Sequence, residues 1–285
     1  MAERPKREGV MLAYPGDEGR IRRLGDRVFA QPKFKGERSR VEWFKDEPYL
    51  LSSYGNEFNQ LPHINAFIKN SPELKDIPLD GELYIHGKPF DGKDGIHSIC
   101  ARRTNKHSFS DTMQFHIFDI QWEDQSQWFR INALKHLEED GILRHPVIAA
   151  KTKIIETADW LNQMNKWVND GYEGIILRSP IAPYFMKRDV CLIKIKPTEI
   201  DEYKIIEVTE AIDKHGVPKG TTGSFLVEDR EGLQFYVGAG KLKHAERDAI
   251  WEDRAVIANR TLVVKHEPEV TKGGVPICAV AVKIK

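Results

Sequence analysis

The sequence predicts an α+β domain followed by a smaller all-β barrel. Two observations carry this prediction. Up to about residue 197, short strand-like segments alternate with amphipathic helical patterns. After Pro197 the pattern changes to five short strand-like segments, with Gly and Asp turns between the middle ones and a single helix. We therefore expect two domains, residues 1–197 and residues 198–285.

The strands of the first domain are expected where apolar residues alternate or run together. Residues 40–44 alternate, with Val41 and Trp43 apolar, and residues 81–86 alternate with Leu83 and Ile85 on one face. Residues 115–120 and 174–177 are short apolar runs that fit buried strands. These segments favour antiparallel sheets with helices between their strands.

Two helices are expected in the first domain from their capping and apolar spacing. Ser126 is a candidate N-cap for a helix that contains Leu134 and Leu137 and ends near Gly141. Thr157 is a candidate N-cap for a second helix, which ends at Gly171. The apolar face of this second helix comprises Leu161, Met164 and Val168.

The second domain has the element content of a small closed barrel. Its expected strands are residues 203–208, 223–227, 234–237, 260–266 and 278–284, with a helix at about 241–253. Five strands with one helix are the content of a barrel of the oligonucleotide-binding type.

Composition excludes several classes of protein. The chain has 285 residues, 40% hydrophobic and 30% charged, which is typical of a globular protein with one large core or two smaller ones. No apolar run approaches the roughly 20 residues of a membrane span, and residues 1–9 lack the apolar core of a signal peptide. We expect a cytoplasmic protein.

The three cysteines are far apart, which argues against a zinc ribbon. The net charge of zero neither favours nor excludes a nucleic-acid partner.

Five short motifs occur in order along the chain. They are KFKGER at 33–38, DGEL at 80–83, FHIFD at 115–119, EGIILR at 173–178 and LIKIK at 192–196. Together with GSFLV at 223–227 and GVP at 274–276, they resemble the ATP-dependent DNA ligases. These enzymes are covalent nucleotidyltransferases that share a fold with RNA ligases and mRNA capping enzymes. The resemblance extends from about Gln31 to Lys285 and indicates a minimal two-domain ligase, in which an adenylation (nucleotidyltransferase, ATP-grasp-like) domain precedes an OB-fold barrel.

The resemblance implies a role for each candidate site residue. Lys33 would attack ATP and carry AMP, with Lys194 and Lys196 holding the triphosphate. Further nucleotide-binding residues implied by the motifs are Gln31, Arg38, Glu82, Phe118 and Glu173. Glu173 and Glu82 are the candidate ligands of Mg²⁺ or Mn²⁺, with Asp80 as a further candidate because it lies two residues before Glu82. Contacts with DNA are implied for Arg38, Ser53 and Arg178.

Two positions depart from the family pattern. Lys35 stands where the family carries an acidic residue, and Ser53 stands where it usually carries an arginine. A second cation near Lys33 favours the neutral, nucleophilic amine but also competes with a metal ion for phosphate. We therefore expect Lys35 to slow nick sealing more than adenylate formation. Serine at position 53 removes one charged phosphate contact, which should reduce the salt dependence of nucleic-acid binding by about one unit.

The implied function is the sealing of nicks between a 3′-hydroxyl and a 5′-phosphate in duplex DNA. The expected substrates are ATP, used with Mg²⁺ or Mn²⁺, and nicked double-stranded DNA, and the protein is expected to be a monomer in a bacterial or phage-infected cell. Two alternatives remain at this point. One is an RNA ligase or capping-type enzyme with the same core. The other is a nick-binding protein whose catalysis is impaired by Lys35.

Overall fold

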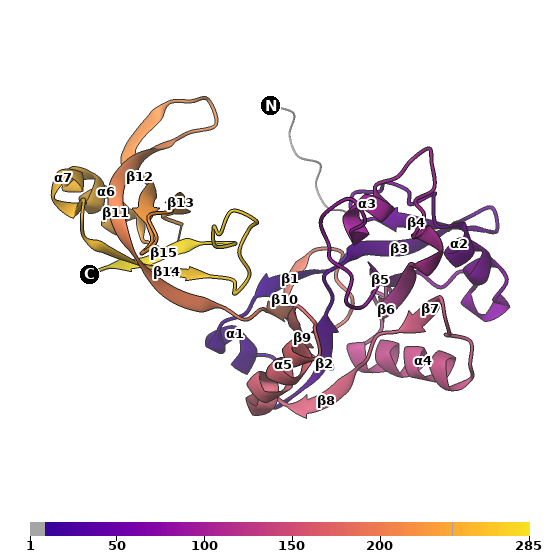
Figure 1. Ribbon diagram of the computed structural model, residues 1–285. Helices are drawn as coiled ribbons and strands as arrows, with labels where there is room; N and C mark the ends of the chain where they lie inside the picture. Colours follow the sequence, from indigo (N-terminus) through magenta and orange to yellow (C-terminus); the bar gives the residue numbers. More distant parts are fainter. Residues whose placement is uncertain (1–8, 241) are drawn as a thin grey trace. The chain divides into compact units, whose positions relative to one another are not determined.

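The chain divides into two compact units. The computed structural model describes residues 9–240 and 242–285. The division between the units falls between Ile195 and Lys196, whereas the sequence predicts it between residues 197 and 198. The first unit has an α+β architecture with two sheets, and the second is a closed barrel (Figure 1). In the described part of the chain, no helix combines the length and apolar character that a membrane crossing requires.

The first unit contains two five-stranded sheets. Sheet A has the strand order β1-β10-β9-β2-β8, and sheet B has the order β4-β3-β5-β6-β7. The strands of sheet A are β1 (Leu12–Pro15), β2 (Arg27–Lys33), β8 (Lys153–Glu156), β9 (Gly174–Arg178) and β10 (Arg188–Ile195). The strands of sheet B are β3 (Glu37–Phe44), β4 (Glu47–Ser52), β5 (Leu79–Tyr84), β6 (Gln114–Ile120) and β7 (Val147–Ala149).

All four strands predicted for this unit are present, as β3, β5, β6 and β9. The prediction of antiparallel sheets needs one correction. Each sheet carries a parallel pair at one edge, β1 with β10 and β6 with β7. Strand β2, which ends at Lys33, is a mostly buried strand that the sequence pattern did not reveal, because its apolar run of three residues is followed by Gln31 and Pro32.

Helices cover the sheets of the first unit. They are α1 (Glu18–Arg22), α2 (Pro62–Lys69), α3 (Ile96–Cys100), α4 (Gln127–Glu139) and α5 (Trp160–Asn169), with 3₁₀ turns at Pro72–Leu74, Ser110–Thr112 and Thr157–Asp159. The predicted cap of α4 is confirmed, since the Ser126 hydroxyl accepts a hydrogen bond from the backbone N–H of Phe129. The predicted cap of α5 is wrong. Thr157 begins the preceding 3₁₀ turn and donates its hydroxyl proton to the carbonyl of Gly25.

Separate apolar cores support the two sheets. The larger lies under sheet B and includes Val41, Leu83 and Ile117, all fully buried. The core of sheet A includes Ile175 and Trp167, the latter from α5. Each sheet therefore has hydrophobic support of its own, and Phe29 of β2 joins the larger core.

The second unit is a closed five-stranded barrel with the strand order β11-β12-β13-β15-β14. Its elements are β11 (Glu199–Ile212), β12 (Pro218–Glu228), β13 (Gln234–Gly238), α6 (His244–Glu252), α7 (Arg254–Ile257), β14 (Thr261–His266) and β15 (Val280–Ile284). The predicted barrel is confirmed, and Phe225, Val237 and Val264 lie in its core. The predicted start of its helix, Lys241, lies outside the described residues.

Candidate active site

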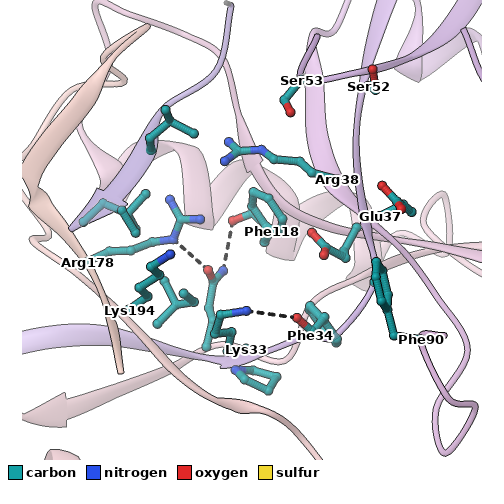
Figure 2. Close-up of a pocket in the computed structure, with 18 of the residues that line it drawn as sticks. Lys33, Phe34, Glu37, Arg38, Ser52, Ser53, Phe90, Phe118, Arg178 and Lys194 are labelled. Carbon is teal, nitrogen blue, oxygen red and sulfur yellow. Dashed lines mark hydrogen bonds between the residues drawn. The ribbon is translucent and has the colours of Figure 1, made fainter. Parts of the chain in front are cut away.

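A cavity of about 580 Å³ lies in the first unit. Its lining comes from both sheets, with Lys33 on β2, Arg38 on β3, Glu82 on β5, Phe118 on β6 and Lys194 on β10 (Figure 2). This volume falls in the range of about 300–1,000 Å³ that small-molecule sites occupy. A nucleotide-sized ligand therefore fits the cavity.

Lys33 is held at the cavity by the pairing of β2 with β9. Lys33 is opposite Gly174 in the antiparallel register, and the backbone N–H of Glu173 donates to the carbonyl of Lys33 at 3.0 Å. This pairing brings the Lys33 ammonium into a salt bridge with the Glu173 carboxylate, and the two side chains are only 19% and 13% exposed. The structure thus joins two residues that are 140 positions apart in the sequence.

Glu82 is a second carboxylate at the cavity wall. Burial, helped by the nearby charges of Glu37 and Glu173 and opposed by Lys33 and Arg38, raises the pKa of its carboxyl to about 7. The carboxylates of Glu82 and Glu173 are hard oxygen donors of the kind that Mg²⁺ binds together with phosphate oxygens. The donor set therefore fits a magnesium ion brought by a nucleotide.

Asp80, the further candidate for a metal ligand, lies outside the described lining of the cavity. Its side chain is fully buried. Arg38 donates from Nε to Oδ1 at 3.0 Å, and the hydroxyl of Tyr184 donates to Oδ2 at 2.7 Å. Asp80 therefore anchors Arg38, and its role as a metal ligand stays a prediction. Arg38 nevertheless lines the cavity, with its guanidinium 5.2 Å from the centre of the Phe118 ring.

Arg178, a predicted DNA contact, lines the cavity and is held by buried partners. Its side chain is 4% exposed and donates to Asp119 and to the Gln31 side-chain oxygen, both at 2.7 Å. The Gln31 amide in turn donates to the carbonyl of Phe118 at 2.9 Å and to Thr152 at 3.0 Å. Figure 2 marks the hydrogen bonds at Arg178 and at Phe118 with dashed lines. These residues form a buried network in the cavity wall, which holds Arg178 and Phe118 at the cavity, and the role of Arg178 toward DNA stays a prediction.

The two lysines predicted beside the triphosphate fall in different units. Lys194 lines the cavity. Lys196 begins the second unit, where its ammonium lies 2.9 Å from the carboxylate of Glu267. Ser53 is buried and lines the cavity, and Phe118 is half-buried there. The roles of Lys196, Ser53 and Phe118 toward nucleotide or DNA stay predictions.

Several cavity residues were not predicted from the sequence, among them Glu37, His97 and Arg188. Glu37 lies inside the KFKGER motif but has no fixed identity in it, and His97 and Arg188 lie outside all five motifs. Nδ1 of His97 lies 2.5 Å from Oε1 of Glu37. No spacing rule connects residues 37 and 97, so only the fold could have revealed this pair.

The fold and the lysine-centred cavity together define the class of covalent nucleotidyltransferases. Residues 10–196 match the family described as "ATP dependent DNA ligase domain". The match covers well over half of the chain, and the protein belongs to the ATP-dependent DNA ligase family.

Viral relatives and solved structures agree with this assignment. The chain is 27% identical over 252 residues to the DNA ligase of African swine fever virus (strain Badajoz 1971 Vero-adapted), a match that covers 82% of this chain and 57% of the relative. The chain thus spans just over half the length of the curated relatives it matches. A structure from a study of Lig E DNA ligases is 24% identical, with a TM-score of 0.70 over 98% of this chain and 99% of that one. The Chlorella virus DNA ligase–adenylate is 20% identical, with a TM-score of 0.52 over 98% and 99%. These structures share the fold.

Proposed function

We propose that this protein is an ATP-dependent DNA ligase that seals nicks between a 3′-hydroxyl and a 5′-phosphate. The observation that carries this proposal is the position of Lys33, held against Glu173 in a nucleotide-sized cavity that also contains Glu82 and Lys194. An amine nucleophile, two carboxylates and a second cation are the groups that adenylyl transfer to a lysine requires.

Adenylation begins when the Lys33 amine leaves Glu173. Only the neutral amine is nucleophilic, so the Lys33 ammonium must first give a proton to solvent and leave its salt bridge with Glu173. The nitrogen of Lys33 then forms a bond to the α-phosphorus of ATP, the bond to the bridging oxygen breaks, pyrophosphate leaves with the electron pair, and a second proton passes from the nitrogen to solvent. Lys194 lies in the same cavity and offsets the negative charge that develops on the phosphates. Glu82 and Glu173 would hold Mg²⁺ or Mn²⁺, which shields that charge when bound.

Sealing follows in two further transfers. AMP passes from Lys33 to the 5′-phosphate at a nick, and the adjacent 3′-hydroxyl then displaces AMP and closes the strand. The second unit is a barrel of the oligonucleotide-binding type, and such barrels bind nucleic acid. Backbone contacts from this barrel would hold the duplex without reading its sequence. The protein would act as a monomer.

The test is covalent labelling with α-labelled ATP and Mg²⁺, followed by a chase onto a nicked duplex. We expect label on the protein, its transfer to DNA and closure of the nick, and a loss of label of at least about a thousandfold in Lys33→Ala. Lys166→Ala, on the exposed side of α5, is the matched control and should label normally.

Three results would contradict this proposal. Labelling with GTP in preference to ATP would indicate a capping-type enzyme. Label that transfers only to nicked RNA would indicate an RNA ligase. Tight binding of nicked DNA with no label at all would indicate the nick-binding alternative, in which Lys35 has disabled the first step.

A further inference from the structure

We propose that His97 is the catalytic base of the sealing step and that Glu37 positions it. This inference rests on the proposed ligase function and assigns a role to a pair of residues that the five motifs do not explain. The pair lies at the same cavity as Lys33, and neither member takes part in holding Lys33.

The geometry of the pair comes from two separate elements. Glu37 is the first residue of β3, and His97 is the second residue of the short helix α3. Nδ1 of His97 lies 2.5 Å from Oε1 of Glu37, and the Phe90 ring packs beside the imidazole with centroids 5.7 Å apart. The His97 side chain is 59% exposed, whereas that of Glu37 is 24% exposed. The carboxylate is thus the sheltered partner, and the imidazole is the accessible one.

This contact determines which nitrogen of His97 is available to a substrate. An ionised carboxylate only accepts hydrogen bonds, so the proton of a neutral imidazole must lie on Nδ1. Nε2 then carries a lone pair on the opposite side of the ring. A carboxylate-oriented imidazole with a bare nitrogen is the arrangement that accepts a proton from a hydroxyl.

Several other ionisable groups at or beside the cavity are less suited to this task. Lys35, next to the cavity residues Phe34 and Gly36, is a cation and cannot accept a proton while charged. Glu173 is engaged with Lys33. Glu82 and Asp91 are the remaining acidic residues of the described lining, and Glu82 is assigned to the metal ion above.

The proposed step balances in bonds and protons. The 3′-hydroxyl oxygen forms a bond to the 5′-phosphorus of the DNA-adenylate, and the bond from that phosphorus to the AMP phosphate oxygen breaks. AMP departs with the bonding electron pair. The proton of the 3′-hydroxyl moves to Nε2 of His97, and Glu37 holds the resulting imidazolium through Nδ1–H.

The experiment measures adenylation and sealing separately. Adenylation is followed with α-labelled ATP, and sealing is followed in single turnover on a nicked duplex that already carries 5′-AMP. For His97→Ala we expect sealing about 100-fold slower, within the range of acid–base catalysis, with adenylation unchanged within about twofold. Added imidazole should restore part of the sealing rate, a rescue that a structural role would not show.

Glu37 is tested by the same two rates. Glu37→Gln should lower the maximal sealing rate without changing the KM for the nick, and imidazole should not rescue it because His97 is still present. Glu37→Asp should keep part of the rate. The matched control is His136→Ala, which removes an exposed histidine 3.7 Å from Glu139 on α4, outside the cavity, and should alter neither step.

Three results would overturn the inference while leaving the proposed function intact. The first is sealing by His97→Ala at the rate of the unmodified protein. The second is an equal loss of adenylation and sealing, and the third is a sealing loss that imidazole does not relieve; either of these two would assign His97 to binding or structure. Failure of the unmodified protein to seal would instead contradict the ligase function itself.

Discussion

Asp80 and Glu82 lie two residues apart on β5, yet the fold gives them opposite surroundings. Asp80 is fully buried, and hydrogen bonds from Arg38 and Tyr184 occupy both of its oxygens. Glu82 is half-buried at the cavity, and burial raises the pKa of its carboxyl to about 7. A buried carboxylate whose oxygens accept hydrogen bonds from protein side chains stabilises the fold. A carboxylate at a cavity without such donors can instead bind a ligand.

Asp119 repeats the pattern of Asp80 on the neighbouring strand β6. It is fully buried, with Arg130 donating to Oδ1 and Arg178 donating to Oδ2, both at 2.7 Å. Arg130 is also fully buried; its Nη1 donates to the carbonyls of Gln125 and Ala182, and its Nη2 donates to the side-chain oxygen of Gln127 at 2.7 Å. The carboxylate is therefore the shared counter-ion of two buried guanidinium groups, and its loss would leave both without a full charge partner.

The largest expected effect in this comparison is that of Asp119→Asn. Removing one partner of a buried ion pair leaves an uncompensated charge, which costs about 3–5 kcal/mol. We expect the free energy of unfolding, measured by urea denaturation, to fall by that amount. Asp124→Asn, five residues further on and exposed, is the control and should change stability by less than about 0.5 kcal/mol. Equal effects of the two variants would show that the buried network contributes little.

Glu82→Gln gives the next largest effect, and its size depends on pH. Because the folded-state pKa of Glu82 is raised from 4.5 to about 7, folded Glu82 keeps its proton over a range in which unfolded Glu82 has lost it. The unfolded state binds fewer protons between pH 4.5 and pH 7, so this group makes stability fall as the pH rises through that window. Substitution by glutamine, which does not titrate, removes this decrease in stability.

The measurement compares the free energies of unfolding of Glu82→Gln and the unmodified protein at pH 4.5 and pH 8. Between pH 4.5 and pH 8, the free energy of unfolding of the variant should gain at most about 3 kcal/mol relative to that of the unmodified protein, because a difference of one pKa unit corresponds to about 1.36 kcal/mol. Glu123→Gln, an exposed residue, should show no such gain. A difference that stays constant with pH would mean that burial does not hold the proton on Glu82.

Periodicity and motifs predicted much of the fold. Strands β3, β5, β6 and β9, the helix capped by Ser126 and the closed barrel all follow from local patterns of apolar residues. Such patterns depend on neighbouring residues alone. They could not reveal the parallel edge strands, because pairing β1 with β10 joins segments that are about 175 residues apart.

The candidate site was predictable only in part, for a related reason. The motifs identified Lys33, Glu82, Glu173 and Lys194, which the fold places at or beside one cavity. The motifs could not distinguish these residues from Asp80 and Arg178. A sequence does not show whether a charged side chain is already hydrogen-bonded by other residues of the protein or is free of such bonds and open to a ligand. The partners that saturate them, such as Tyr184, lie outside the motifs.

Lys35→Asp extends the comparison by placing a new carboxylate beside the cavity, between Phe34 and Gly36. An aspartate there removes a cation that competes with Mg²⁺ for phosphate and adds an oxygen donor. We expect nick sealing to become about tenfold faster, equivalent to about 1.4 kcal/mol, and adenylation to change less. The rates are measured with α-labelled ATP and with a pre-adenylated nick, and Lys166→Asp, which makes the same charge change on α5, should affect neither. Sealing no faster than in the unmodified protein would show that the carboxylates already present, Glu82 and Glu173 among them, suffice for the reaction.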